Sequence, residues 1–233
     1  MTTLVLIRHG QTASNISGAL DTGCPGVPLT ALGKQQAQAL AGRWLDDIGP
    51  APHIVGISPL RRTRMTAAPL IERFSPRVDV KRGVREIRAG DLEMGTSLSD
   101  GFVYHRTVER WCAGEKDLPM PGAENGYDVL ARALPDIFDL LYQAQDASGN
   151  EGIAALVVHG AFIRFIGSQL AHNLSAELVG AVRMDNTMTT RIEFDANILE
   201  SAGPGEILGR GTALTWNDQP IDSYSSLNGG HNE

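Results

Sequence analysis

Two short segments carry residues that could act on a phosphate group. Arg8, His9 and Gly10 follow one another near the N-terminus, and His159 is followed by Gly160 much later in the chain. An arginine can bind two oxygens of a phosphate through parallel hydrogen bonds. A histidine has a neutral nitrogen near pH 7, which can attack phosphorus. Short matches also arise by accident, so a plain surface Arg-His pair is the alternative at this point.

Positive charge is concentrated a second time just after Ser58 and Pro59, in Arg61 and Arg62. Ser58 as the N-cap and Pro59 at the first helical position predict the start of a helix. The free backbone N–H groups of such a helix start attract anions. Both arginines would lie within this first turn, and a solvated basic turn is the alternative.

Two uninterrupted apolar runs, residues 4–7 and 153–158, must position these groups. A short apolar run without alternation is typical of a strand that is buried on both faces of a parallel sheet. Each run leads to a histidine followed by a glycine. Ligands of open α/β sheets bind beyond the carboxyl ends of the strands. If the two strands are neighbours, His9 and His159 reach the same crevice, and the arginines add positive charge to it.

The remaining chain alternates between helical and extended patterns, which predicts an α/β fold. Thr30 caps one predicted helix, and Pro135 should kink or restart another. We expect a single-domain, three-layer αβα sandwich with a mostly parallel central sheet over residues 1–216. Residues 217–233 are polar and rich in Gly and Ser, which predicts a flexible C-terminal tail. Further strands are expected at residues 54–57, 78–80, 188–194 and 208–216, and further helices at residues 31–45, 99–111, 129–141 and 161–172.

Composition narrows the class of protein. The 233 residues are 42% apolar, which is enough for one large domain with a sizeable core. The net charge of −7 argues against a nucleic-acid partner and requires any phosphate site to be a local cluster of Arg and His. Neither a signal-peptide pattern nor an apolar run of membrane-spanning length is present, so we expect no membrane partner. Cys24 and Cys112 fit no metal pattern and are interpreted as free thiols of a cytoplasmic protein.

Six motifs occur in a fixed order between residue 4 and about residue 164. They are Arg8-His9-Gly10-Gln11-Thr12 with Asn15, Leu29-Thr30-x-x-Gly33, Ser58-Pro59-Leu60-x-Arg62-Thr63 with Thr66-Ala67, Glu86-Ile87-x-x-Gly90, Pro121-Gly122-x-Glu124 and Val157-Val158-His159-Gly160. Each motif alone is weak, whereas the ordered set is highly specific. The set resembles that of the histidine phosphatase superfamily, the phosphoglycerate mutase-like proteins.

This resemblance implies a role for each matching residue of the central motifs. His9 would be the nucleophile that becomes phosphohistidine. Arg8, Arg62 and His159 would hold the transferring phosphoryl group. Glu86 would protonate the leaving group and later activate water. The resemblance implies neither a metal nor a cofactor, because two arginines and a second imidazole supply the positive charge that phosphoryl transfer needs.

The same resemblance implies further phosphate contacts and leaves one role open. Asn15 would bind the same phosphate, and Thr22 and Gly23 would add contacts from the following loop. The acid loop of the family often closes with Glu-Gly, whereas Met94 follows Glu93 here. Glu93 therefore stays the second choice for the acid.

The predicted function is that of a metal-independent phosphomonoesterase, which acts on a small phosphorylated metabolite through a phosphohistidine intermediate. The alternative is a cofactor-dependent phosphoglycerate mutase-type phosphotransferase, and the third interpretation is a non-catalytic phospho-ligand binding module. Ser14 stands where mutases commonly carry Trp, and the segment 86–159 is short for a mutase, which favours hydrolysis. A pure binding module has no use for an acid such as Glu86.

The substrate class stays open at this level. Phe102, Tyr104, His105 and Arg106 are candidates for the pocket wall, and the last two could hold a second anionic group. The alternative for them is a solvated helix face. A homodimer is compatible with the fold, and the apolar side chains of residues 178–182 would serve either the core or a subunit contact.

Overall fold

Strands β1 (Thr2–Arg8) and β4 (Ile153–Val158) lie side by side and parallel in the middle of the sheet. Arg8 at the end of β1 pairs with Val158 at the end of β4. The His9 N–H donates to the Val158 carbonyl at 3.0 Å. The two histidines that follow these strands therefore lie at the same edge of the sheet, as predicted.

The computed structural model describes residues 1–148 and 151–228, and within them the central sheet has the order β3-β2-β4-β1-β5-β6. The four strands from β3 to β1 are parallel, and β5 and β6 pair antiparallel at one edge. The expected mostly parallel sheet is thus confirmed. The strands beyond β1 and β4 are β2 (Ile54–Ile57), β3 (Arg77–Val80), β5 (Thr189–Phe194) and β6 (Thr212–Ala213), and β7 (Thr215–Trp216) and β8 (Gln219–Pro220) form a separate pair.

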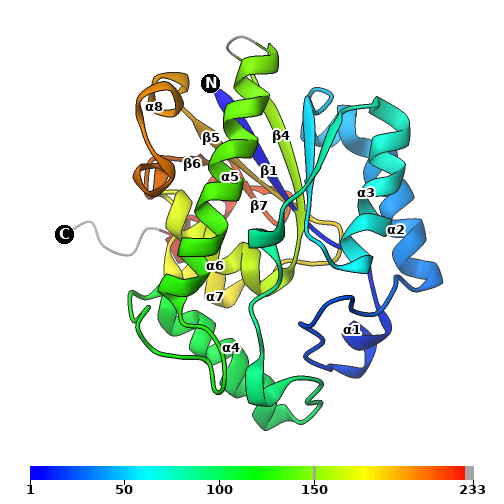
Figure 1. The fold of residues 1–233 in the computed structure, drawn as a ribbon, viewed down its shortest axis with the longest axis vertical. Coiled ribbons are helices and arrows are strands. Elements are labelled where there is room, and N and C mark those ends of the chain that lie inside the picture. Colours follow the sequence, from blue (N-terminus) through cyan, green and yellow to red (C-terminus); the bar gives the residue numbers. More distant parts are fainter. Residues whose placement is uncertain (149–150, 229–233) are drawn as a thin grey trace.

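Helices cover both faces of this sheet (Figure 1). The helices α2 (Ala31–Arg43) and α3 (Arg61–Phe74) lie on one face, and α5 (Gly126–Ser148) and α6 (Gly160–Leu170) lie on the other. Further helices are α1 (Ala13–Ser17), α4 (Leu98–Cys112), α7 (Ala176–Ala181) and α8 (Ala196–Ser201). In Figure 1, α1 and α4 lie at the lower end, toward which β1 and β4 run.

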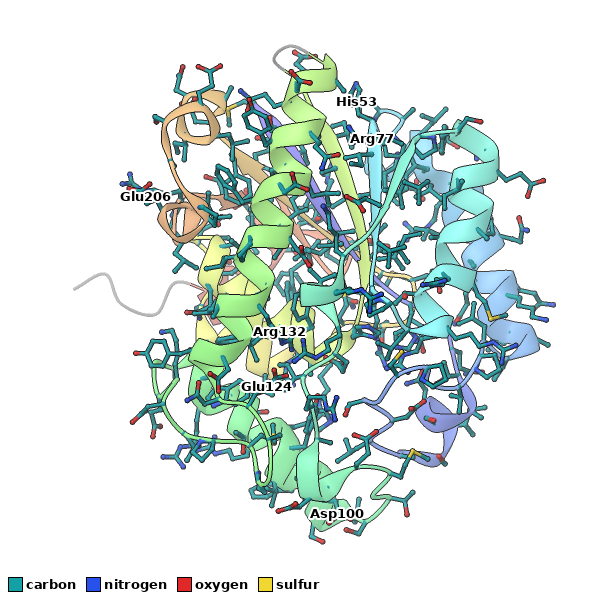
Figure 2. The ribbon with its side chains drawn as sticks, viewed as in Figure 1. His53, Arg77, Asp100, Glu124, Arg132 and Glu206 are labelled. Atoms are coloured by element: carbon teal, nitrogen blue, oxygen red, sulfur yellow. The ribbon has the colours of Figure 1, made fainter. Side chains whose placement is uncertain are left out.

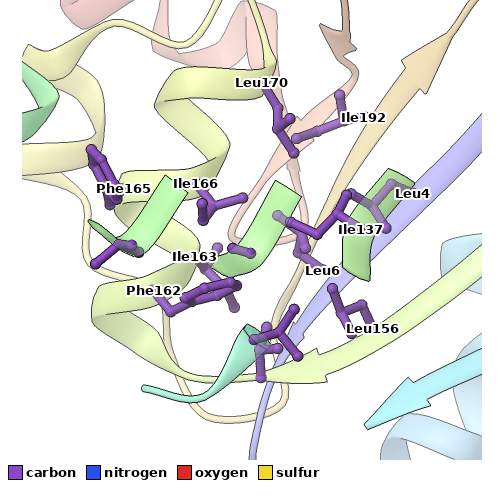
Figure 3. Close-up of a cluster of buried hydrophobic side chains, with 14 of the residues drawn as sticks. Leu4, Leu6, Ile137, Leu156, Phe162, Ile163, Phe165, Ile166, Leu170 and Ile192 are labelled. Carbon is purple, nitrogen blue, oxygen red and sulfur yellow. The ribbon is translucent and has the colours of Figure 1, made fainter. Parts of the chain in front are cut away.

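The side chains of β1 alternate between two hydrophobic cores. Leu4 and Leu6 belong to the core shared with α5 and α6, whereas Val5 and Ile7 belong to the core shared with α2 and α3. Figure 3 shows Leu4 and Leu6 beside Ile137 of α5. A strand between two helical layers has no polar face, which explains the lack of alternation in its sequence. The predicted three-layer αβα sandwich is confirmed.

The predicted start of α3 is wrong by a few residues. Leu60 is the N-cap and the helix begins at Arg61, so Ser58 does not cap it. Ser58 still belongs to the sheet edge, because its N–H donates to the Val157 carbonyl at 3.1 Å. Arg61 and Arg62 lie in the first helical turn, as predicted.

A single helix, α5, runs through Pro135, so the predicted restart does not occur. Proline lacks the N–H for one helical hydrogen bond. The buried side chains of Leu134 and Ile137 flank it and pack in the core, which holds the helix on both sides. In the described part of the chain, no helix, α5 included, is long and apolar enough to cross a membrane.

The predicted flexible tail differs from the structure as far as residue 228. After β8, residues Ile221–Tyr224 form a 3-10 turn and Ser225–Asn228 form α9. Ile221, Tyr224 and Leu227 pack against the core, and this spacing of three gives the segment one apolar side that its polar composition obscures. Residues 229–233 of the predicted tail lie outside the described residues.

Candidate active site

A pocket of about 300 Å³ lies at the carboxyl ends of β1 and β4. Among its lining residues are Arg8, His9, Arg62 and Glu86. These four come from β1, the loop after it, the first turn of α3 and the loop after β3. The fold therefore brings together side chains from three separate segments of the chain, including most of those that the motifs predicted to be catalytic.

His9 is buried and held in one tautomer. Its Nδ1 lies 2.7 Å from the carbonyl oxygen of Gly10, so Nδ1 carries the proton and donates it to this bond. The Nε2 atom therefore keeps its lone pair. Burial, together with the nearby Arg62 and Arg8, lowers the pKa of His9 well below 6.5. The imidazole is thus neutral at pH 7, which is the state that a nucleophile requires.

His159 is fully buried and orients Arg62. Its ring lies edge-on to the ring of His9, with 5.4 Å between the centroids. The Nε2 atom lies 2.7 Å from Ser58 Oγ, and Nδ1 accepts from the Arg62 Nε at 3.3 Å. Burial and the adjacent Arg62 lower the pKa of His159 well below its usual value. His159 lies against His9 and Arg62, although it is not among the residues that line the pocket.

Asp21 pairs with Arg62 in the same pocket. Arg62 Nη1 lies 3.3 Å from Asp21 Oδ2, and Nη2 donates to the Asp21 carbonyl at 2.8 Å. Asp21 Oδ2 also accepts from the Ser14 hydroxyl at 3.2 Å and from the Val27 N–H at 3.0 Å. Asp21 thus ties the loop after α1 to the start of α3.

Arg8 is tied to a segment that lies far away in the sequence. Its Nη1 donates to the Met184 carbonyl at 2.5 Å, while its buried Nε has no partner among the described residues. The Asn186 amide donates to the His9 carbonyl at 2.8 Å and to Asn15 Oδ1 at 3.2 Å. The segment after α7 therefore braces both ends of the Arg8-His9 motif.

Asn15 lines the pocket and also closes the N-terminus of α1. Its Oδ1 accepts from the Thr12 N–H at 3.0 Å, and its own N–H donates to the Thr12 hydroxyl at 3.2 Å. This reciprocal pair is a capping box. The amide Nδ2 of Asn15 is the group that remains for a phosphate oxygen.

Glu86 lies against the N-terminus of α6. Its carboxylate accepts from the N–H groups of Ile87 at 2.9 Å, Phe162 at 3.0 Å and Ala161 at 3.4 Å. Burial nevertheless raises the pKa of Glu86, because it disfavours the charged form more than these bonds favour it. A carboxyl group with a raised pKa, lining the same pocket as His9, suits a general acid.

Glu93 binds the backbone of the loop that follows α1 and does not line the pocket. It accepts from the N–H groups of Thr22 and Gly23, both at 2.8 Å, and from the Thr22 hydroxyl. Glu93 and Gly23 are not among the lining residues, whereas Thr22 is. The geometry therefore favours Glu86 over Glu93 as the acid, and Thr22 over Gly23 as a phosphate contact.

A largely buried ion pair stabilises the loop that carries Glu86. Arg132 Nη2 lies 2.7 Å from Glu124 Oε1, and Figure 2 shows the two side chains next to each other. Glu124 also accepts from the Arg88 N–H at 3.0 Å, and Arg132 donates to the Arg85 carbonyl at 3.0 Å. The weak motif around Glu124 thus has a structural role, because it holds residues on both sides of Glu86.

Several residues that line the pocket or bond its lining escaped the sequence interpretation. Asp21 and Asn186 lie in loops without sequence periodicity, so no local sequence pattern identifies either residue. Arg164 has a signal in hindsight, because it is the single charged residue of a mostly apolar helix, α6. Arg183 lines the pocket without any such signal. Tyr104 and His105, named as candidate wall residues, do line it, whereas Phe102 and Arg106 do not.

The sequence matches the histidine phosphatase superfamily (branch 1) over residues 4–201. The chain belongs to this superfamily. This histidine phosphatase is 31% identical over 179 residues to a glucosyl-3-phosphoglycerate phosphatase of Mycolicibacterium vanbaalenii, a match that covers 72% of this chain and 73% of the relative. It is 29% identical over 209 residues to a 2,3-bisphosphoglycerate-dependent phosphoglycerate mutase of Rhizobium etli, covering 86% and 95%. Phosphatases and mutases therefore both occur among its relatives.

Two further matches concern length and fold. A PE-PGRS family protein of Mycobacterium tuberculosis is 36% identical over 173 residues, which are 70% of this chain and only 29% of that protein. The solved structure of a mycobacterial glucosyl-3-phosphoglycerate phosphatase superimposes with a TM-score of 0.72 at 25% identity, over 94% of this histidine phosphatase and 100% of that chain. The relatives support a phosphatase for small metabolites, with the mutase as the alternative.

Proposed function

We propose that this histidine phosphatase hydrolyses the phosphate monoester of a small metabolite, without a metal, through a phosphohistidine at His9. The hydrogen bond from His9 Nδ1 to the Gly10 carbonyl carries the proposal. It leaves Nε2 unprotonated in a pocket that Glu86, Arg8 and Arg62 also line. A binding module needs the arginines alone, whereas a nucleophile and an acid together serve a reaction.

The reaction runs in two displacements. In the first, His9 Nε2 forms a bond to phosphorus, the ester P–O bond breaks, and Glu86 gives its proton to the leaving oxygen. In the second, the Glu86 carboxylate accepts a proton from water, the water oxygen attacks phosphorus, and the N–P bond breaks. Phosphate and the regenerated His9 and Glu86 are the products.

Positive charge stabilises the phosphoryl group in both steps. Arg8 and Arg62 line the pocket next to His9, and preorganised charge of this kind is often the largest catalytic contribution. The Nδ2 amide of Asn15 and the N-terminal loop at Thr22 add neutral contacts. His159 orients Arg62 by accepting a hydrogen bond from its Nε.

A mutase differs only in the acceptor that meets phosphohistidine. Water gives hydrolysis, and a hydroxyl of a bound phosphorylated acid gives transfer. The similarity to the Rhizobium etli mutase keeps this second candidate. The small side chain of Ser14, which lines the pocket, leaves room for water and supports hydrolysis.

Phosphate release from a panel of phosphorylated metabolites, in EDTA, tests the proposal. We expect release by the wild type and none by the His9→Ala variant, together with an acid-labile phosphoenzyme in the wild type after rapid quenching. Loss of activity in EDTA and its return with a divalent metal would contradict it. Conversion of 3-phosphoglycerate to 2-phosphoglycerate without release would identify a mutase.

The cellular compartment and the oligomeric state of the enzyme stay predictions. The two cysteines are free thiols, which supports a reducing compartment such as the cytoplasm. Leu178 and Val179 are fully buried in the core, so neither serves a subunit contact. A homodimer remains compatible with this fold.

A further inference from the structure

The turn between β7 and β8 lies outside the pocket lining and takes no part in the proposed reaction. It consists of Asn217 and Asp218, with φ angles of 50° and 66°. A two-residue hairpin turn with two positive φ angles favours Asn and Asp, so the sequence suits this geometry. We call these two residues the hairpin turn.

The hairpin turn bonds both ends of the segment 185–189, which lies against the Arg8-His9 motif. Asn217 Oδ1 accepts from the Asp185 N–H at 2.8 Å. Asp218 Oδ1 accepts from the Thr189 N–H at 2.7 Å and from the Thr189 hydroxyl at 2.6 Å. The Asp218 N–H also donates to the Thr189 carbonyl at 3.0 Å. Asp218 therefore fixes the point at which this segment becomes β5.

Arg43, the last residue of α2, connects Asp218 to the middle of the same segment. Its Nη2 lies 2.6 Å from Asp218 Oδ2, as an ion pair without hydrogen-bond alignment, and donates to the Thr187 carbonyl at 3.2 Å. The side chains of Arg43 and Asp218 are 24% and 15% exposed, so water screens their attraction only in part. The Arg43–Asp218 pair thus ties the segment to α2.

Thr187 has a backbone conformation that its side chain disfavours. Its φ is 62°, in the left-handed region, where a β-branched residue is rare. Such a conformation persists only when the surrounding structure enforces it. The Thr187 carbonyl accepts from Arg43, and the Thr187 N–H donates to the Arg8 carbonyl at 3.0 Å. Contacts on both sides of Thr187 therefore maintain the strained conformation.

The residues just before Thr187 contact the proposed catalytic motif. The Met184 carbonyl accepts from Arg8 Nη1 at 2.5 Å, and the Asn186 amide donates to the His9 carbonyl at 2.8 Å. If Thr187 relaxed, these two groups would move, and the Arg8 guanidinium and the His9 backbone would lose their present contacts. The direction of Arg8 toward a phosphate therefore depends on what holds Thr187.

We propose that Arg43 and Asp218 are positioning residues, which hold Thr187 in its left-handed conformation and thereby align Arg8 and His9. The inference rests on the proposed function for the roles of Arg8 and His9. Neither positioning residue lines the pocket, so each acts through the segment 184–188. A displacement of about 1 Å in a catalytic group can lower the rate about 10²-fold, so a small shift of this segment is enough.

The Asp218→Asn variant removes the ion pair and keeps the turn, because Asn is nearly isosteric and tolerates a positive φ. We expect kcat to fall about tenfold and the inhibition constant of inorganic phosphate to rise about three- to tenfold, since Arg8 is misaligned. Alkyl and aryl esters should slow by the same factor, because the acid Glu86 is not displaced. Arg43→Gln, which removes the opposite charge of the pair, should give the same changes.

A purely structural role predicts a different result. Loss of folded enzyme lowers kcat but leaves the inhibition constant of phosphate unchanged, and this outcome in both variants would overturn the inference. Urea unfolding measures the folded fraction of each variant at the assay temperature. Asp47→Asn is the matched control, because Asp47 lies 3.8 Å from the same Arg43 and is 56% exposed. It should change neither constant, and equal effects of Asp47→Asn and Asp218→Asn would also overturn the inference.

A rescue variant tests the link through Thr187. Asn adopts a positive φ more readily than a β-branched residue, so Thr187→Asn should need the Arg43–Asp218 pair less. In this background we expect Asp218→Asn to lower kcat by a smaller factor than in the wild type. An equal or larger factor would overturn the proposed role of Thr187.

A binding measurement separates this inference from the proposed function. Inorganic phosphate is titrated calorimetrically into the wild type and into the Asp218→Asn and Asp47→Asn variants. If no ester is hydrolysed but Asp218→Asn alone binds phosphate about threefold or more weakly, the hydrolase proposal fails and the positioning of Arg8 stands. If esters are hydrolysed and Asp218→Asn matches the wild type in rate and binding, the positioning inference fails and the hydrolase proposal stands.

Discussion

The Oδ2 atom of Asp21 lies 3.3 Å from Nη1 of Arg62, where Arg62 is buried and the Asp21 side chain is largely buried. Arg62 is one of the two arginines proposed to hold the phosphoryl group. Its charge is therefore partly balanced by a carboxylate of the protein before a substrate binds. A phosphate that enters must share Arg62 with Asp21, and this weakens the binding of inorganic phosphate, the expected product.

Asp21→Asn should tighten the binding of inorganic phosphate. The amide is nearly isosteric and can still bond Arg62, while it removes the negative charge next to the site. We expect the inhibition constant of phosphate to fall about three- to tenfold. Product inhibition of the hydrolysis of p-nitrophenyl phosphate measures this, with Asp117→Asn at an exposed site as the control for net charge. A higher inhibition constant would mean that Asp21 mainly holds Arg62 in position.

Glu86→Gln should slow alkyl phosphates more than aryl phosphates. An alkoxide is a poor leaving group and needs the proton of Glu86, whereas p-nitrophenolate does not. We expect kcat for an alkyl ester to fall about 10²- to 10⁴-fold and kcat for p-nitrophenyl phosphate to fall much less. Glu93→Gln, which loses a loop contact only, should leave the alkyl-to-aryl ratio unchanged. Equal slowing of both esters by Glu86→Gln would assign the acid elsewhere.

The pH profile should report His9 on its acid side and Glu86 on its alkaline side. Burial lowers the pKa of His9, so the neutral nucleophile persists well below pH 6.5 and is lost only as the pH falls further. Burial raises the pKa of Glu86, so its protonated form persists above pH 4.5 and is lost as the pH rises. We expect the alkaline decline of kcat for an alkyl ester to disappear in Glu86→Gln. A decline that persists in this variant would belong to another group.

Glu124→Ala should destabilise the fold and impair catalysis together. It leaves the largely buried Arg132 guanidinium without its carboxylate, which costs about 3 kcal/mol of unfolding free energy. It also frees the Arg88 N–H beside Glu86, so kcat should fall. Urea unfolding and steady-state kinetics check both effects. Glu115→Ala, which breaks the exposed ion pair to Arg110, is the control and should change neither appreciably.

The predictable part of the site consists of residues that follow regular elements. His9 and His159 come directly after apolar strands, and Arg62 lies at a helix start, so the local pattern determines where each side chain emerges. Asp21 and Arg183 depend on loops, whose conformation follows from contacts made across the whole fold. The pairing of Asp21 with Arg62 spans 41 residues, and no local periodicity encodes it.

The fold was predictable for a similar reason. Because β1 and β4 are buried on both faces, each consists of an uninterrupted apolar run, and this run made both strands recognisable in the sequence. The segment after residue 217 was misjudged because its overall composition is polar, while Tyr224 and Leu227 bury one side of it. Composition averages over a segment, whereas packing depends on which side each residue faces.

Strand β1 is synthesised long before its two neighbours in the sheet. β1 pairs on one side with β4 and on the other with β5, which are made about 150 and 190 residues later. The Arg8-His9 motif likewise meets Met184 and Asn186 only after most of the chain has been synthesised. Contacts of such long sequence separation make folding slow. A chain that stops before residue 186 therefore carries His9 without Met184 and Asn186, and the proposed site is incomplete until that segment has been made.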